Sequence, residues 1–254
     1  GLRQVYNAWC RRVPFDNVRK MLALRTGSPL PGCDATDFFE GWLEPGAGGP
    51  CWSGSNALYE LLCSLGFRAR RAAGSMHDIG SPNHGTVIAT LDSAEFLADS
   101  SLLTYEPVPL AGGLHTYDDG VNRIEVEPDA GGHILWTRGP HQSFFLACRI
   151  FHEDVSHETV LANYENSRRE SPFNQRLYAL RSLPGRMILL RGNTRYERTR
   201  SGVSTQNLTP EELCDSLHAD IGLSRPLIDV WSDCGALAAS LEPPFGPAPP
   251  PPRN

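Results

Sequence analysis

The chain has 254 residues and a formal net charge of −6, with 40% hydrophobic and 20% charged residues. This composition is that of a globular protein, long enough for one large domain or for two to three subdomains that share a core. The acidic balance argues against a nucleic-acid-binding protein, which needs a basic face. No segment has the roughly 18 consecutive apolar residues of a membrane span, and the N-terminal residues lack the pattern of a signal peptide. We therefore expect a cytoplasmic protein.

Cysteine and lysine usage limits the chemistry further. The 7 cysteines are widely spread, with no Cys-x-x-Cys pair and no histidine at zinc-ligand spacing, which argues against a disulfide framework and against a structural metal site. Among the 23 basic residues lysine occurs once, at Lys20. We interpret the excess of arginine as coding bias in the source genome rather than as anion recognition.

The first part of the chain contains most of the predicted helices. Residues 2–12 form a helix that stops at Val13, because Pro14 excludes the helical conformation from the residue before it. Further helical segments are expected at 16–24 and 34–43, within a region that is otherwise rich in glycine and proline.

The most regular helix is predicted for residues 54–65, where leucines repeat on one stripe and Gly66 is placed for a left-handed C-terminal cap. Ser53 or Ser55 can cap its N-terminus. Cys51 then lies just before the first turn, where unpaired backbone N–H groups and the positive end of the helix dipole lower the pKa of its thiol. This position favours a nucleophile. The leucines of the stripe are Leu58, Leu61, Leu62 and Leu65.

Short strands dominate the rest of the chain and predict an antiparallel sheet or barrel. A last helix begins at Thr209, with a proline and two acids in its first turn, and runs to Ile221. The proline-rich tail, residues 242–254, is expected to be an extended, mobile spacer. The strands are expected at residues 68–76, 84–91, 94–99, 123–127, 132–138, 143–151, 177–180, 187–190 and 193–200.

Residues 84–99 have the form of a β-hairpin with a two-residue turn at 92–93. In that register Thr86 lies opposite Asp99. Because side chains alternate between the faces of a strand, His84 shares a face with Asp99. The two residues are then diagonal neighbours, about 7–8 Å apart at the backbone and close enough for a side-chain hydrogen bond.

These residues are a candidate site for nucleophilic catalysis by a thiol. A carboxylate from Asp99 on one imidazole nitrogen fixes the tautomer of His84, so that the other nitrogen takes the proton of Cys51. Other interpretations stay open at this point. Cys51 can be a small buried thiol that fills space, His84 a strand-end residue bonded to backbone, and Asp99 a turn or capping residue.

Several segments, in order along the chain, resemble the arylamine N-acetyltransferase family and its amide-synthase relatives. Val13-Pro14-Phe15-Asp16-Asn17 is similar to the family's Val-Pro-Phe-Glu-Asn, and Gly48-Gly49-Pro50-Cys51-Trp52 is similar to Gly-Gly-x-Cys-Phe. His84 and Asp99 follow at the separation of the family's histidine and aspartate. The later landmarks are Asn163-Tyr164, Ser171-Pro172-Phe173 and Leu208-Thr209-Pro210-Glu211-Glu212-Leu213.

The resemblance implies an α+β fold in three parts. An N-terminal helical bundle, residues 1–72, carries the nucleophile, an antiparallel β-barrel, residues 73–170, carries the histidine and the aspartate, and an α/β lid occupies residues 171–241. The resemblance also implies that Cys51, His84 and Asp99 form a catalytic triad for ping-pong acyl transfer. The residues expected to bind substrate are Phe15, Trp52, Ser100, Ser101 and Phe173.

Two segments differ from the family pattern. The family has Arg-Gly-x-Gly-Gly before the cysteine, whereas residues 44–49 of this chain lack the arginine. The family has Asp-Val-Gly-Phe-Gly after the triad acid, whereas this chain has Asp99-Ser100-Ser101-Leu102-Leu103. The bulkier residues imply a reshaped entrance and argue against acetyl-CoA and a simple arylamine as the substrate pair.

We therefore expect a cysteine-dependent acyltransferase that moves an acyl group from a thioester to a small-molecule amine, or an amide synthase of specialised metabolism such as antibiotic biosynthesis. The thioester is a co-substrate, carried by coenzyme A or by the phosphopantetheine of an acyl carrier protein, and no cofactor or metal is bound permanently. The alternatives are a thiol hydrolase, either an amidase or a thioesterase, and a catalytically idle binding scaffold. Neither a nucleic-acid partner nor a membrane partner is expected.

Overall fold

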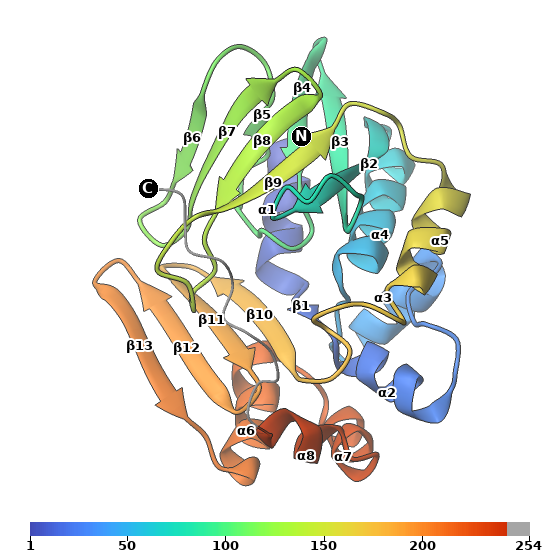
Figure 1. Cartoon of the computed structure of the whole chain (residues 1–254), viewed down its shortest axis with the longest axis vertical. Helices are drawn as coiled ribbons and strands as arrows, with labels where there is room; N and C mark the ends of the chain where they lie inside the picture. The colour runs from blue at the N-terminus through green and yellow to red at the C-terminus, as the bar shows by residue number, and fades with distance from the viewer. Residues whose placement is uncertain (243–254) are drawn as a thin grey trace.

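A computed structural model describes residues 1–242, and Figure 1 shows two antiparallel sheets with helices packed beside them. The predicted tail lies outside the described residues, apart from Glu242. None of the helices within residues 1–242 combines the length and the hydrophobicity needed to cross a bilayer. The N-terminal elements are α1 (Leu2–Arg12), β1 (Phe15–Asp16), α2 (Val18–Thr26), α3 (Ala35–Leu43) and α4 (Cys51–Ser64).

The larger sheet has 8 strands in the order β5-β4-β3-β2-β9-β8-β7-β6. Its two edge strands contact each other, so the sheet closes almost into a barrel. Apolar side chains from strands all around it, such as Ile88, Leu97 and Ile124, form one buried cluster. The strands are β2 (Arg68–Met76), β3 (His84–Leu91), β4 (Ala94–Ala98), β5 (Val108–Pro109), β6 (His115–Asp118), β7 (Arg123–Asp129), β8 (Gly132–Thr137) and β9 (Leu146–Phe151).

The smaller sheet has 5 strands in the order β1-β10-β11-β12-β13. Its first strand comes from the N-terminal part of the chain, where Phe15 pairs with Leu180 of β10. The C-terminal helices cover the sheet and bury Trp231 completely. These elements are α5 (His157–Asn166), β10 (Tyr178–Leu183), β11 (Arg186–Arg191), β12 (Thr194–Thr199), β13 (Gly202–Asn207), α6 (Pro210–Ser216), the π-helical turn η1 (Leu217–Ile221), α7 (Arg225–Asp233) and α8 (Ala236–Leu241).

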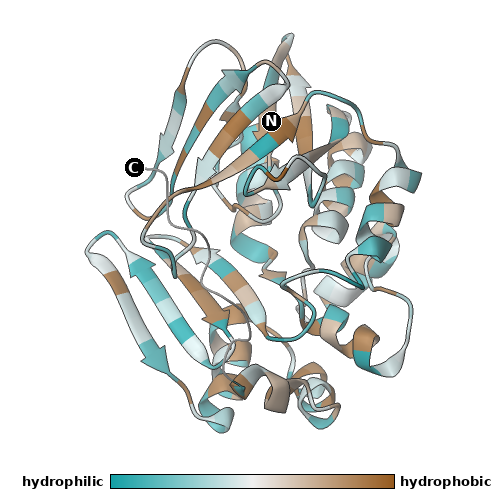
Figure 2. Ribbon diagram, viewed as in Figure 1, coloured by the Kyte–Doolittle hydropathy of each residue, from teal (hydrophilic) through white to brown (hydrophobic). Residues whose placement is uncertain are grey.

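The predicted fold class is confirmed: the protein has helices, an antiparallel barrel and a C-terminal α/β part. Several individual elements were not predicted. The last predicted helix does reach Ile221, as α6 and η1, yet α7 and α8 follow it. Strand β13 is exposed on both faces, so its sequence lacks the alternation that marks a half-buried strand. Figure 2 shows β12 as a mostly hydrophilic strand and β13, at the outer side of the sheet, as a largely neutral strand with a hydrophilic end.

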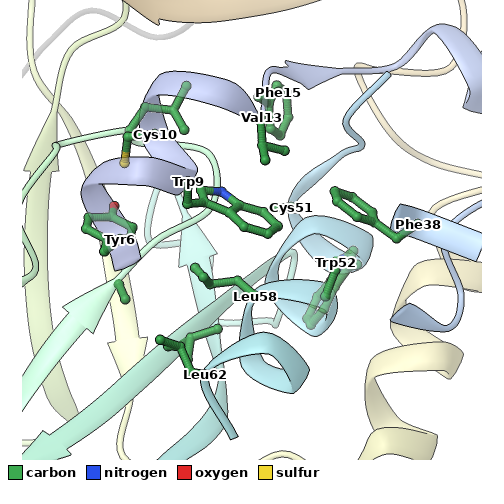
Figure 3. Close-up of a cluster of buried hydrophobic side chains, with 14 of the residues drawn as sticks. Tyr6, Trp9, Cys10, Val13, Phe15, Phe38, Cys51, Trp52, Leu58 and Leu62 are labelled. Carbon is green, nitrogen blue, oxygen red and sulfur yellow. The ribbon is translucent and has the colours of Figure 1, made fainter. Parts of the chain in front are cut away.

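One hydrophobic core joins the N-terminal helices to both sheets. Its members include Tyr6 of α1, Leu58 of α4, Val87 of β3 and Leu189 of β11. Figure 3 shows the Trp9 indole between α1 and the start of α4, close to Phe38, whose ring is stacked on it at 5.7 Å between centroids. The expected boundaries at residues 72, 170 and 241 stay a prediction.

Helix α4 is anchored by its buried leucines, so shortening one of them will destabilise the fold. Leu58 is completely buried, and we expect Leu58→Ala to lower the free energy of unfolding by about 2–5 kcal/mol, because a cavity adds to the lost hydrophobic burial. Urea denaturation followed by circular dichroism measures the change. Leu65→Ala is the control, since Leu65 is 54% exposed and its loss should change stability by about 0.5 kcal/mol or less. Equal effects of the two substitutions would contradict the packing described here.

Candidate active site

Cys51 is the first residue of α4, and Pro50 occupies the N-cap position. The predicted serine cap is therefore wrong. The Ser53 hydroxyl instead donates to the Pro50 carbonyl (3.2 Å), and the Ser55 hydroxyl donates to the Gly85 carbonyl on β3 (2.7 Å). The thiol nevertheless lies at the positive end of the helix, as expected for a nucleophile, and the residue is 6% exposed.

The loop that leads into Cys51 is held by a buried carboxylate. One oxygen of Asp16 accepts a hydrogen bond from the Gly48 N–H (2.7 Å) and the other from the Val18 N–H (3.0 Å). Gly48 has no room for a side chain, because a Cβ would lie 1.8 Å from the Pro14 carbonyl oxygen. Burial raises the pKa of Asp16 to about 6, although the two backbone hydrogen bonds oppose the shift. Asp16 thus ties β1 to the nucleophile loop.

Strand β3 packs directly against the start of α4, and this contact brings His84 to Cys51. Gly85 permits the close approach, since a Cβ at that position would lie 2.7 Å from the Trp52 side chain. The His84 ring and the Gly85 backbone both lower the pKa of the Cys51 thiol. The cysteine and the histidine are therefore close enough to interact electrostatically.

The predicted hairpin register is also confirmed. Leu91 pairs with Ala94, and both turn residues, 92 and 93, have positive φ (49° and 67°), as a two-residue turn of this type requires. The His84 Nε2 atom lies 2.7 Å from Asp99 Oδ2. The other ring nitrogen, Nδ1, is thereby left for the thiol.

The second oxygen of Asp99 is fully occupied by its own loop. Oδ1 accepts hydrogen bonds from the Ser101 N–H (2.9 Å), the Ser101 hydroxyl (2.7 Å) and the Leu102 N–H (3.1 Å). The Tyr6 hydroxyl donates to the Asp99 carbonyl at 2.7 Å. These contacts fix the carboxylate in the plane and direction that its bond to His84 requires.

The three side chains shift one another's pKa values. Burial raises the pKa of the Cys51 thiol, but the hydrogen bond and the positive charge of His84 outweigh it, so the net shift is downward. Burial lowers the pKa of His84, but the Asp99 carboxylate and the Cys51 thiol raise it well above its usual value. The pKa of Asp99 falls to about 2, because the effects of His84 and Ser101 exceed the opposing effect of burial. The shifts of Cys51 and His84 both favour a thiolate beside an imidazolium.

The residues expected to bind substrate fall into two groups by their contacts. Phe15 packs edge-to-face on Phe173 (5.3 Å between ring centroids), which places both in one aromatic group. Trp52 is buried beside Gly85. The Ser100 hydroxyl lies 2.9 Å from the Ser55 hydroxyl and is buried. Ser101 binds Asp99, as described above.

Sequence reasoning assigned no role to Asp16 or to Lys20, which is buried on α2. The sequence feature that could have singled out Lys20 is that it is the one lysine of the chain.

A groove of about 920 Å³ has none of the three candidate catalytic residues in its lining, which is formed by Leu24, Gly27, Ser28, Pro29, Glu165, Arg168, Arg169, Asn174 and Gln175. All 7 cysteines are free thiols.

Solved structures of enzymes that acetylate arylamines share this fold. The arylamine N-acetyltransferase of Mycobacterium tuberculosis is 17% identical in sequence, with 95% of this chain and 92% of that chain covered and a TM-score of 0.79. The Mycobacterium marinum enzyme in complex with CoA is 18% identical, with 94% and 91% covered and a TM-score of 0.79. The NAT3 enzyme of Bacillus cereus, described as having a unique Cys-His-Glu catalytic triad, is 17% identical, with 88% and 90% covered and a TM-score of 0.73.

Sequence comparison gives the family. No curated protein matches the chain, but the family model described as N-acetyltransferase matches residues 1–226. That match covers well over half of the chain, and the structural neighbours carry the same activity in their names. The protein therefore belongs to the arylamine N-acetyltransferase family, whose members are acyltransferases.

Proposed function

We propose that Cys51, His84 and Asp99 form the catalytic triad of a cysteine-dependent acyltransferase that moves an acyl group from a thioester to an amine. The observation that carries the proposal is the buried hydrogen bond between His84 and Asp99, together with the lowering of the Cys51 pKa by the His84 ring. Two neighbours support it, because one is described with a Cys-His-Glu triad and another binds CoA.

In the first half-reaction the Cys51 thiolate attacks the thioester carbonyl and forms a new S–C bond. The tetrahedral oxyanion needs backbone donors, and the N–H of Cys51, in the first turn of α4 where intrahelical partners are absent, is one candidate. The bond to the donor sulfur then breaks, and the His84 imidazolium gives its proton to the departing thiolate. Cys51 is left acylated and His84 neutral.

In the second half-reaction an amine attacks the acyl-enzyme. Neutral His84 takes one proton from the attacking nitrogen, the C–S bond breaks, and Cys51 leaves as a thiolate beside the imidazolium. The product is an amide. Asp99 keeps its negative charge throughout and stabilises the imidazolium in both halves.

The finer assignments follow from the surroundings of the triad. Phe15 and Phe173 would form an aromatic wall for the acyl group or the amine, and Trp52 would close the opposite side. Because the Ser100 and Ser101 hydroxyls are bonded internally, these residues would shape the site rather than bind substrate directly. The donor would be a CoA or carrier-protein thioester, in an N-acyltransferase or amide synthase of the cytoplasm.

The first prediction concerns the acyl-enzyme. Incubation with acetyl-CoA and with longer acyl-CoA thioesters should add one acyl group to the protein in intact-mass spectra, and Cys51→Ala should abolish the adduct. Cys63→Ala is the matched control and should retain it. An adduct that an amine discharges faster than water supports transfer, whereas equal discharge by water identifies a thiol hydrolase. An adduct retained in Cys51→Ala would overturn the assignment of the nucleophile.

The second prediction concerns pH. Because the pKa of Cys51 is lowered, its thiolate persists at pH values at which an ordinary cysteine is protonated. Its alkylation by iodoacetamide should therefore decline only as the pH falls through that lowered pKa. Burial raises the pKa of Cys33, so Cys33 should need a more alkaline pH and serves as an internal control. Peptide mass spectrometry measures both rates, and His84→Gln should move the Cys51 profile to higher pH. Identical profiles for the two thiols would contradict the thiolate–imidazolium pair.

The third prediction concerns Asp99. Asp99→Asn removes the charge that stabilises the imidazolium, so kcat/KM should fall about 100-fold or more, measured with one acyl-CoA and one arylamine. Ser101→Ala keeps the carboxylate and its two backbone hydrogen bonds, and should lose much less activity. If both variants lost the same small factor, Asp99 would have no part in the chemistry.

A further inference from the structure

Lys20 on α2 is a buried charge that the proposed triad does not use. It is 2% exposed, and its ammonium donates to the Ser167 hydroxyl (2.8 Å) and to the Ser167 carbonyl (3.3 Å). The ammonium also lies 5.8 Å from the centre of the Tyr164 ring. Within residues 1–242, its hydrogen bonds both go to Ser167 and no carboxylate lies within ion-pair distance.

This environment leaves the charge only partly compensated. An ammonium has three donor hydrogens, and two of them are used. Ser167 caps the C-terminus of α5, so the negative end of that helix offsets part of the positive charge. A buried charge without a full partner is costly, and one carboxylate oxygen on the third N–H would complete the pairing.

The composition of the chain points to the same position. All other basic residues among the 23 are arginine, so coding bias accounts for the arginines but not for the one lysine. Lysine differs from arginine in being a compact point charge on a flexible stem, without a planar fork of donors. The one lysine is therefore a buried point charge, to which a single carboxylate oxygen can bind.

Tyr164 connects the surroundings of Lys20 with those of the nucleophile. Its ring centre lies 5.8 Å from the ammonium, it belongs to the same buried cluster as Cys51, and its hydroxyl donates to the Pro31 carbonyl (2.9 Å). Burial lowers the pKa of Lys20 to about 8, and the negative charge of Cys51 opposes that shift. The ammonium is thus mostly charged at neutral pH and within electrostatic reach of the thiolate.

The neighbourhood also has an unused acceptor. The Ser167 carbonyl that binds Lys20 accepts a second hydrogen bond from the Asn174 amide (2.9 Å). The same amide nitrogen donates to the Arg168 carbonyl (3.0 Å), which fixes its orientation. Asn174 Oδ1 is then buried and has no hydrogen-bond partner among the described residues. Two polar groups around Ser167 are therefore unpaired: the third N–H of Lys20, which can bind a carboxylate, and Asn174 Oδ1, which can accept only from an N–H or hydroxyl of a ligand.

We propose that Lys20 binds a carboxylate of the substrate while the acyl group is transferred through Cys51, so that the enzyme selects carboxylate-bearing substrates. The inference rests on the proposed acyltransferase function. The carboxylate belongs either to the acyl group, as in the monothioester of a dicarboxylic acid, or to the amine. In both cases it completes the ion pair that the protein leaves open.

Kinetics with matched substrate pairs test the proposal and identify the source of the carboxylate. One arm compares succinyl-CoA with butyryl-CoA at a fixed neutral amine, and the other compares 4-aminobenzoate with its methyl ester at fixed acetyl-CoA. Lys20→Met should lower kcat/KM for the carboxylate substrate of one arm about 10- to 100-fold, the effect of losing a hydrogen bond to a charged group, and should barely change that of its neutral analogue. Arg169→Met, which removes a nearby exposed charge, should affect neither. Equal losses for charged and neutral substrates in both arms would overturn the proposal.

A binding measurement separates this inference from the proposed function. Protein labelled with ¹⁵Nζ-lysine gives one side-chain signal, because Lys20 is the one lysine. In Cys51→Ala, which does not turn over, succinyl-CoA or 4-aminobenzoate should shift that signal in a saturable way, and the neutral analogue should not. If no acyl adduct forms at Cys51 but the lysine signal still shifts with a carboxylate, the acyltransferase mechanism is rejected and carboxylate binding at Lys20 is not. No shift with either carboxylate would reject carboxylate binding at Lys20, whether or not the Lys20→Met variant folds.

Discussion

The close contact between α4 and β3 is the constraint on which the candidate site depends. A thiol at a helix N-terminus and a histidine at a strand start come from separate segments, and they meet only because Gly85 lets the strand lie against the Trp52 side chain. The hydrogen bond from Ser55 to the Gly85 carbonyl fixes the same approach. Without it, Cys51 would keep the helix dipole but lose the imidazolium, which makes the largest favourable contribution to its thiolate.

The two buried aspartates show how partners, rather than burial alone, decide the pKa of a carboxyl group. Asp99 and Asp16 are each 1% exposed, and burial raises the pKa of both. The imidazolium of His84 and the donors of Ser101 reverse that effect at Asp99, whose pKa falls to about 2. Asp16 accepts only backbone N–H groups at hydrogen-bond distance, and its pKa rises to about 6. One is thus suited to stabilise a cation, and the other to hold a loop.

Sequence reasoning reached the parts of the site that depend on local geometry. A two-residue turn fixes the register of a hairpin, so the pairing of His84 with Asp99 followed from side-chain alternation. The helix after Cys51 followed from its leucine stripe. Contacts between distant segments could not be predicted from the sequence. The pairing of Phe15 with Leu180, the hydrogen bond of Asp16 to Gly48 and the environment of Lys20 each depend on how separate elements pack.

The structure also changes the meaning of the segment after Asp99. The sequence comparison placed the two serines at the substrate entrance, but Ser100 lies against the first turn of α4 and Ser101 binds the carboxylate. Both act on the geometry of the triad, and neither hydroxyl hydrogen is left to donate to a ligand. Selectivity among substrates must then come from groups that are not already bonded to the protein. Under the two proposals above, the aromatic group at Phe15 and the third N–H of Lys20 would be such groups, one apolar and one charged, and they would suit an acyl or amine substrate with an apolar body and an anionic end.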